Sequence, residues 1–486
     1  MATDGARLRP DLGRVDFTLL VIGAVVGADV YVVAAMGAGF LGPAQLVAWV
    51  AAGVLAALIA LTFVQCAAID SNVGGSYTYA RAAFGPLAGF LAGWALYAGE
   101  WVALPIFPLA FGNYLERLAP GLPHPAVVLA EVALIAAVTG SNFAGVRKGA
   151  RVNDLLTVAK LVPLALLIAL GLAFAFFRHG QATGHLHPFA PLGWGGFGSA
   201  IVPIFWAYAG FELAVLPAAE VRSPERTLPQ GLIVGMVIAT IFYLLTAFTV
   251  VVAIPWQEAA SSSSPLAAAM SAIFEGFGGS GRAGAAIMSV GALISIVGVY
   301  EAFTLGVARL SFALGADGLF PPAFARVHPK YGTPYVGLAF QAAAALLGAT
   351  LFDLRGLITI AVFFLGIAYL ATALAALRLV TRNPDRALRL PGLRAALVLA
   401  GASAVYLASQ APHRQIAIGT GVMLLGLVVY MLRGAQWRRI AEELHTGERA
   451  AVRWTEHHYH WLQAPARRLR RAVWHARSAG RSRHDA

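Results

Sequence analysis

Two glycine-containing stretches, VIGAVVGADVYVV (residues 21–33) and IFWAYAGFELAVLPAAE (residues 204–220), carry the strongest architectural signal in this chain. Each lies in an apolar run, and in each a glycine precedes an acid by two places: Gly27 precedes Asp29, and Gly210 precedes Glu212. Glycine in mid-helix lowers helix stability and lets the backbone unwind. Unwound backbone at membrane depth is tolerated only where it is buried in protein or lines a cavity. The pattern therefore predicts two discontinuous helices that meet near the middle of a bilayer.

The composition places most of the chain in lipid. Of its 486 residues, 59% are hydrophobic and only 12% are charged, whereas soluble domains carry about 25% charged residues. This difference excludes a soluble globular protein. A single cysteine, Cys66, excludes an intrachain disulfide. The first apolar run is longer than a signal-peptide core, so we expect it to be retained as a span.

A transmembrane helix needs about 20 mostly apolar residues, and this length predicts an all-α integral membrane protein with twelve transmembrane helices. With both termini in the cytoplasm, the inner segments carry most of the Arg and Lys residues, as the positive-inside rule requires. We therefore expect a multi-pass protein of the plasma (inner) membrane with both termini cytoplasmic. The net charge of +12 then reflects topology and not nucleic-acid binding. The predicted spans are 15–40, 44–68, 84–112, 124–143, 153–177, 197–219, 228–254, 283–313, 334–351, 356–379, 393–411 and 415–433.

The breaks fall in spans 1 and 6, which indicates two repeats of five helices. The C-terminal tail interleaves Trp and Arg, which suits an interfacial helix attracted to anionic lipid; a solvated tail is an equal alternative because Pro465 interrupts it. The run Glu456–His460 resembles a metal cluster, but adjacent His residues point in different directions on a helix, so we predict no metal site. The predicted parts are a cytoplasmic N-terminus (1–14), a first repeat (15–194), a second inverted repeat (195–391), helices 11 and 12 (392–434) and a basic, aromatic cytoplasmic tail (435–486).

Five blocks of sequence occur in series: GAVVGADVY (23–31), SNVGGSYTYARAAFGPLAGFLAGW (71–94), NFAGVRKGARVNDLLTVAKLVPL (142–164), FWAYAGFELAVLPAAEVRSPERTLPQGL (205–232) and VARLSFALGADGLFPPAFARVHPKYGTPYVG (307–337). Together they resemble the amino acid-polyamine-organocation (APC) superfamily of secondary transporters across nearly all of the first ten spans. The resemblance implies a five-plus-five inverted-repeat, LeuT-like fold with broken helices 1 and 6. It also implies alternating access and two peripheral helices.

Five ionisable residues lie inside the predicted spans, where such residues are costly and are functional candidates by default. Four are acids and one is a base, so the interior is electronegative unless protons or a cationic substrate compensate. The five residues are Asp29, Glu100, Lys160, Glu212 and Glu301.

The resemblance implies a substrate site around the first break. Amino-acid carriers of the superfamily bind the substrate carboxylate there through freed backbone N–H groups, but Gly27-Ala28-Asp29 departs from their pattern, because an acid would repel a carboxylate and attract an amine. Glu100 matches the pocket-lining face of the third span and strengthens the prediction of a cationic substrate. The other predicted substrate-binding residues are Trp206, expected to close over the substrate, Tyr208, Gly210 and Phe303.

Proton coupling is predicted at Glu212 and Lys160. Glu212 matches a proton-responsive acid of several superfamily members; alternatively, a protonated carboxyl there ties its span permanently to a neighbour. Lys160 matches a lysine that takes the place of a sodium ion in proton-coupled members, and a static ion pair with Asp29 or Glu212 is an equal alternative. Glu301 is a possible additional site whose direction stays open.

These features predict a secondary active transporter of an organic cation (a polyamine, another amine or a basic amino acid), linked to protons and working by alternating access. The alternative is a proton-coupled symporter of neutral or broad-range amino acids, in which Asp29 is a second proton site. An inorganic cation carrier and an intramembrane enzyme are less favoured. Enzyme motifs such as Gly-x-Ser-x-Gly and His-Glu-x-x-His are absent from the sequence, so we expect neither an enzyme nor a cofactor.

Overall fold

The regular elements of the computed structural model are helices, with no β-strand among the residues that it describes. Among the described residues, seven helices are long and apolar enough to cross a bilayer, and the pair Leu161–Phe177 and His179–Leu186, bent by 102°, is an eighth candidate. An all-helical protein with several membrane-spanning helices is therefore confirmed, whereas the twelve spans and the inverted repeat stay predictions. The described residues are 13–27, 29–69, 75–144, 149–214 and 221–431.

The first predicted span is interrupted, as its glycine indicates. It consists of α1 (Arg14–Val25), α2 (Asp29–Val33) and α3 (Ala38–Leu41). The third predicted span is also divided, into α6 and α7, because Pro105 cannot continue the hydrogen bonding of α6. The remaining elements of this half are η1 (Gly42–Ala44), α4 (Gln45–Ile69), α5 (Ser76–Phe84), α6 (Pro86–Ala103), α7 (Ile106–Leu118), α8 (His124–Ala144), α9 (Gly149–Phe177) and α10 (His179–Leu186).

The second half contains the second predicted break, between α11 (Phe197–Trp206) and α12 (Phe211–Ala214). Short helices that no 20-residue apolar run signals, such as α14 and α15, connect its longer helices. The elements that follow α12 are α13 (Pro224–Ala253), α14 (Trp256–Ser261), α15 (Pro265–Gly276), α16 (Gly281–Ala316), η3 (Pro322–Ala325), α17 (Tyr335–Leu351), α18 (Leu354–Arg382), η4 (Pro384–Arg386), α19 (Leu393–Ser409) and a last helix, His413–Met431.

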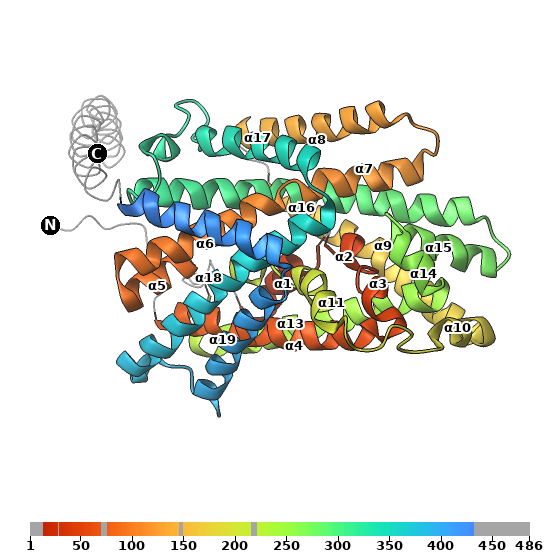
Figure 1. Cartoon of the computed structure of the whole chain (residues 1–486), viewed down its shortest axis with the longest axis horizontal. Coiled ribbons are helices and arrows are strands. Elements are labelled where there is room, and N and C mark those ends of the chain that lie inside the picture. The colour runs from red at the N-terminus through yellow and green to blue at the C-terminus, as the bar shows by residue number, and fades with distance from the viewer. Residues whose placement is uncertain (1–12, 28, 70–74, 145–148, 215–220, 432–486) are drawn as a thin grey trace, which may run out of the picture.

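Small residues let the helices around the breaks approach closely. The helix α13 packs against both α1 and α4, and α18 packs against α6 and α19 (Figure 1). A Cβ on Gly53 of α4 would collide with the Thr240 side chain of α13, and one on Gly291 of α16 would collide with Pro163 of α9. Such contacts between small residues are typical of helices packed within a membrane.

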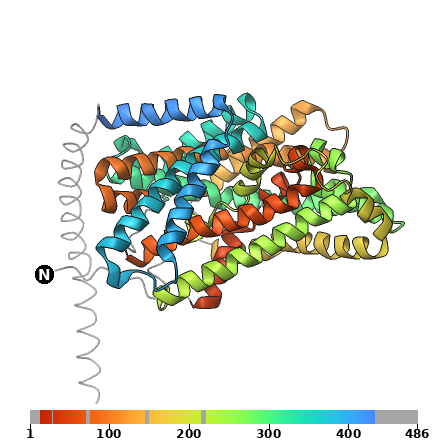
Figure 2. The ribbon, with the colours of Figure 1, turned by 60° about the horizontal axis from the view of Figure 1, so that its bottom comes forward.

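The outward faces of the helices are apolar. Large apolar side chains on the long helices point outwards, as the exposed fractions of Phe176 (77%), Ile241 (53%) and Leu347 (60%) show. Lipid rather than water suits such a surface. The last helix, blue in Figure 2, lies at the edge of the bundle, and only 11% of its most apolar stretch is buried. The polar residues considered next lie on the inner side of this apolar shell.

Candidate functional site

The first break lies between Val25, the last residue of α1, and Asp29, the first residue of α2. The Asp29 carboxylate turns back towards the break, since a Cβ on Gly27 would lie 3.1 Å from Asp29 Oδ2. An acid in this position is favourable at the positive N-terminal end of a helix. Ala28, which was predicted to line the substrate site, lies outside the described residues.

The second break has the same arrangement. Gly210 has a φ of +111°, a conformation that favours glycine, and it turns the chain between α11 and α12. The Gly210 N–H donates a hydrogen bond of 3.0 Å to Glu212 Oε2, so this acid also caps the helix half that follows its break. In both breaks, therefore, the acid two residues after the glycine folds back towards it, and at the second break the φ of Gly210 also requires glycine.

Tyr243 of α13 joins the two breaks. Its hydroxyl lies 2.6 Å from the carbonyl oxygen of Val25, at the end of α1, and 2.9 Å from that of Ala207, just after α11. Unwinding frees these carbonyls from their helices, and within a membrane they need an internal donor. The hydroxyl proton of Tyr243 supplies it, shared between the two acceptors. The sequence analysis did not identify this residue.

Three of the four predicted acids lie together. Asp29, Glu100 and Glu212 are 8%, 6% and 4% exposed. The carboxyl groups of Glu100 and Glu212 are within hydrogen-bonding reach of each other, and the Asp29 charge acts on Glu100 as well. Two unit charges about 3 Å apart repel by roughly 5 kcal/mol at an effective dielectric constant of about 20. This acid cluster (Asp29, Glu100 and Glu212) therefore calls for a proton, a cation or both.

An aromatic wall joins α7, α11 and α16 beside Trp206, the last residue of α11 before the second break. Phe107 of α7 is its centre: its ring centroid lies 6.2 Å from that of Trp206, 5.2 Å from that of Phe303 and 5.6 Å from that of Tyr300. Trp206 and Phe303 were expected in the site, and the structure joins them through Phe107. The sequence analysis missed Phe107 and Tyr300. Trp206 is 4% exposed and Phe107 1%, so both rings are buried.

Tyr208 faces a different part of the protein from Trp206. Its hydroxyl donates a hydrogen bond of 2.9 Å to the carbonyl of Trp49 in α4, and its ring packs against those of Trp49 and Tyr243. This geometry gives Tyr208 a supporting position behind the second break.

Glu301 and Lys160 are not placed in the acid cluster by any described contact. Glu301 of α16 is half-buried, and its backbone carbonyl accepts a hydrogen bond of 3.3 Å from Asn142 Nδ2 of α8. Lys160 belongs to α9, but its side chain lies outside the described residues, as do the predicted tail and its His residues. Their predicted roles therefore stay predictions.

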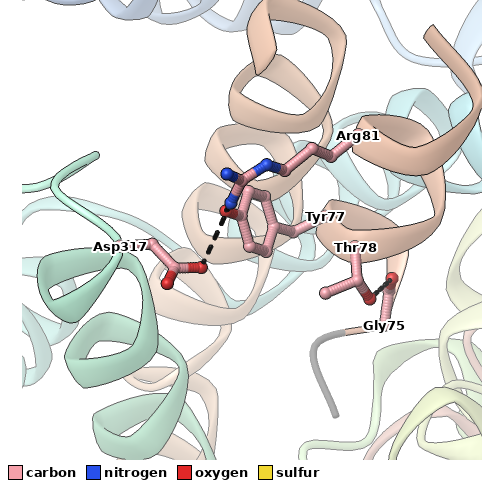
Figure 3. Close-up of polar contacts among 5 residues, drawn as sticks. All are labelled: Gly75, Tyr77, Thr78, Arg81 and Asp317. Atoms are coloured by element: carbon pink, nitrogen blue, oxygen red, sulfur yellow. Dashed lines mark hydrogen bonds and ion pairs between the residues drawn. The ribbon is translucent and has the colours of Figure 1, made fainter. Parts of the chain in front are cut away.

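A second polar cluster connects α5 to the end of α16 (Figure 3). Arg81 Nη1 donates a hydrogen bond of 2.5 Å to the Tyr77 hydroxyl and lies 3.7 Å from Asp317 Oδ2. Burial, followed by the hydrogen bond to Asp317 and the charge of its carboxylate, raises the pKa of Tyr77 to about 12. Tyr77 is therefore neutral near pH 7 and donates its proton to the Asp317 carboxylate. The cluster holds α5, which lies between two spans, against the end of α16.

Comparison with known proteins gives a consistent result over nearly the whole chain. The profile of a family described as amino acid permease matches residues 12–432. The branched-chain amino acid permease BcaP of Bacillus subtilis (strain 168) is 29% identical over 454 residues, which cover 89% of this chain and 94% of the relative. The serine/threonine exchanger SteT of the same strain is 28% identical over 408 residues, 80% of this chain and 88% of the relative. Cationic amino acid transporter 4 of Mus musculus is 27% identical over 400 residues, 78% of this chain and 61% of the relative.

Proposed function

The chain belongs to the amino acid permease family, and on that premise we propose that it is a proton-linked secondary active transporter of amino acids that carry a positively charged side chain. Membership of this family supports amino acid transport as the activity, and the named relatives are transporters and not enzymes. Alternating access is the mechanism proposed for it, with the two broken helices as the moving parts. Placement in the plasma (inner) membrane with cytoplasmic termini belongs to the same proposal.

The observation that carries this proposal is the charge of the buried acid cluster. Among the residues whose burial is described, the buried charged side chains are Asp29, Glu100 and Glu212, all acids. A substrate with an additional cationic group supplies the charge that such a site lacks. The aromatic wall of Phe107, Trp206 and Phe303 suits the same substrate, because a cation is attracted to the face of an aromatic ring.

A proton link is proposed for two reasons. Buried acids at hydrogen-bonding distance bind a proton more readily than exposed acids do. Lys160 of α9 matches in sequence a lysine that takes the place of a sodium ion in proton-coupled members of the superfamily, and a lysine in such a place repels sodium. An ion gradient also needs no nucleotide-binding motif, and no Gly-x4-Gly-Lys-Ser/Thr sequence occurs in this chain.

A neutral amino acid is the second candidate. Asp29 and Glu212 each turn towards the glycine of their own break, and Glu212 accepts the N–H of Gly210, so part of the Glu212 charge is compensated by backbone and not by substrate. Two of the named relatives are described as a branched-chain amino acid permease and a serine/threonine exchanger. In this case Asp29 is protonated when the substrate binds. A polyamine, which has no carboxylate, is less consistent with the family than a basic amino acid.

Uptake into proteoliposomes decides between these candidates. The purified protein is reconstituted into proteoliposomes, and the pH of the external medium is set to an alkaline, a neutral or an acidic value. At each pH, uptake of labelled arginine, lysine, leucine, serine and putrescine is measured. We expect arginine or lysine to accumulate when the outer medium is acidic and to stop accumulating when an ionophore collapses the proton gradient. If leucine or serine is taken up and neither arginine nor lysine inhibits that uptake, the proposal of a cationic substrate is rejected. Accumulation that follows a sodium gradient alone would reject the proton link.

A further inference from the structure

We propose that Glu100 of α6 and Glu212 of α12 form a single proton-binding site, in which the two carboxyl groups hold one proton between them. This deepens the function proposed above and rests on its proton linkage. It differs from the sequence prediction, which placed Glu100 among the substrate ligands and assigned proton coupling to Glu212 and Lys160. The site would make the joint between α6 and the second broken helix depend on protonation.

The geometry requires the proton. The two carboxyl groups are within hydrogen-bonding reach of each other, and the side chains are 6% and 4% exposed. An ionised carboxylate has only acceptor oxygens, so two of them make no hydrogen bond with each other. A carboxylic acid beside a carboxylate does make one, and like charges held this close are avoided when one proton is shared.

The neighbouring groups indicate which residue carries the proton. Glu212 accepts the Gly210 N–H at 3.0 Å, and donors of this kind stabilise the ionised form of a carboxyl group. Glu100 Oε1 is buried and accepts no hydrogen bond from the described residues. The favoured arrangement is therefore a protonated Glu100 that donates to an ionised Glu212.

Among the described residues, no positively charged side chain is found next to the Glu100–Glu212 pair. The titratable groups that face it are the Asp29 carboxylate of α2 and the Tyr369 hydroxyl of α18, which lies beside both acids. Asp29 disfavours a second negative charge on Glu100, and a tyrosine hydroxyl can donate to Glu212. The Lys160 side chain of α9 lies outside the described residues.

Loss of the proton would loosen the joint. The proton passes from the Glu100 carboxyl to water, which leaves two carboxylates and changes no other bond. The carboxylates then repel each other, and α12, which is only four residues long and follows a glycine turn, is the element free to move away from α6. Protonation from the other side of the membrane would restore the joint.

Infrared spectroscopy of the purified protein tests the pair without any substrate. The C=O stretching band of protonated carboxyl groups is recorded as a function of pH for the wild type, Glu100→Gln and Glu212→Gln. A matched control, Glu116→Gln, changes an exposed acid at the end of α7. Size-exclusion profiles show whether each variant keeps its fold.

Three results are expected. The wild type has a band near neutral pH that Glu100→Gln lacks. In Glu212→Gln the band remains but disappears at a pH lower by about one unit or more, because the neighbouring negative charge is gone. Glu116→Gln retains the wild-type band and its pH dependence.

Unchanged pH dependence in a folded Glu212→Gln protein would overturn the shared proton, and so would a wild-type band that Glu100→Gln retains. These results are independent of transport. If the band behaves as expected but no amino acid is taken up with protons, the proposed function fails and the proton site stands. If amino acids are taken up with protons but the band does not respond to Glu212→Gln, the function stands and the pair is rejected.

Discussion

At the residue scale, the direction of the Asp29 carboxylate separates two roles for this acid. It lies against the glycine of its own break, where it favours the start of α2, and it also lies close enough to Glu100 to add to the negative charge of the site. A capping role needs only a hydrogen-bond acceptor, which asparagine also provides. A role in binding a substrate amine needs the charge. An isosteric change therefore distinguishes the two.

We predict that Asp29→Asn weakens the binding of a cationic amino acid while the fold is retained. A hydrogen bond to a charged group contributes about 1.5–3 kcal/mol, which corresponds to roughly a 10- to 150-fold loss of affinity. The measurement is the concentration of unlabelled arginine that halves labelled uptake or thermal stabilisation. Asp317→Asn, the same change outside the acid cluster, is the control. An unchanged affinity in a folded Asp29→Asn protein would assign Asp29 to capping alone.

Tyr243 is the second residue whose chemistry can be tested in isolation. We predict that Tyr243→Phe lowers the free energy of unfolding by about 1–3 kcal/mol, because it leaves buried carbonyls of both breaks without their donor. The matched control is Tyr208→Phe, since both tyrosines are fully buried and both donate to a carbonyl. The acceptor of Tyr208 is Trp49, within the intact helix α4, and that carbonyl keeps its helical hydrogen bond. Thermal unfolding midpoints that fall equally in both variants would contradict the role of Tyr243 at the breaks.

At the element scale, the broken helices were predictable and their surroundings were not. Gly27 and Gly210 indicated both interruptions because a glycine before an acid in an apolar run is a local signal. Phe107, Tyr300 and Tyr243 were missed because their contacts depend on how separate helices are rotated against one another, and a shift of one residue turns a side chain by about 100°. The one available signal was the Tyr243 hydroxyl itself, which needs a partner inside an apolar span.

The length of apolar runs explains a second difference. A search for apolar runs of about 20 residues finds helices that cross a bilayer. It does not find α5, α14 or α15, which are 9, 6 and 12 residues long. Residues 84–112, predicted as one span, contain α6 and α7, which together form one candidate span, Pro86–Leu118. Proline at 105 is compatible with a span that bends, so the sequence alone did not fix where α6 ends.

The joint between α5 and α16 gives a prediction with a defined pH window. The pKa of Tyr77 is raised from 10.0 to about 12, mainly by burial and then by Asp317. The folded protein therefore holds this proton more tightly than the unfolded chain, so the associated stability is complete below pH 10 and is lost as the pH rises through about 12. In Asp317→Asn we expect a smaller loss that is complete at a lower pH, because the negative charge that helps to raise the pKa of Tyr77 is removed.

Thermal unfolding of the wild type, Asp317→Asn and Tyr77→Phe across this window provides the measurement. Below pH 10 we expect the ion pair of Arg81 with Asp317 to contribute less than about 1 kcal/mol, since both side chains are about half exposed. Tyr77→Phe has no hydroxyl to titrate, so its stability relative to the wild type should rise between pH 10 and 12. A constant difference between the two proteins across that range would show that the Tyr77 proton does not link α5 to α16.

At the scale of the whole molecule, the distribution of charge separates topology from function. Most of the 35 Lys and Arg residues lie in segments between or beyond the predicted spans, whereas the buried acids lie at the two breaks (Asp29 and Glu212) and within α6 (Glu100). The first group is the basis of the predicted orientation in the membrane, according to the positive-inside rule. The positive-inside rule does not explain the second group, the buried acids, and these support a substrate or a coupling ion of positive charge.

Orientation can be tested across α19, the helix for which spanning is least obvious. Its 17 residues, Leu393–Ser409, extend about 26 Å at 1.5 Å per residue, somewhat less than a hydrocarbon core of about 30 Å. If α19 spans the membrane, exposed residues just before and just after it lie on opposite sides. Asp385 and His413 are exposed and occupy these positions.

We therefore predict that a membrane-impermeant maleimide labels His413→Cys in intact cells and Asp385→Cys only after the membrane is permeabilised. The single native cysteine, Cys66, is fully buried and should leave the wild type unlabelled, which makes it the background control. Labelling of both variants from the outside would place both ends of α19 on one side, and the twelve-span topology would then be wrong. Labelling of Asp385→Cys alone in intact cells would retain the span but invert the orientation, so the termini would lie outside and the positive-inside interpretation of the Arg and Lys residues would fail.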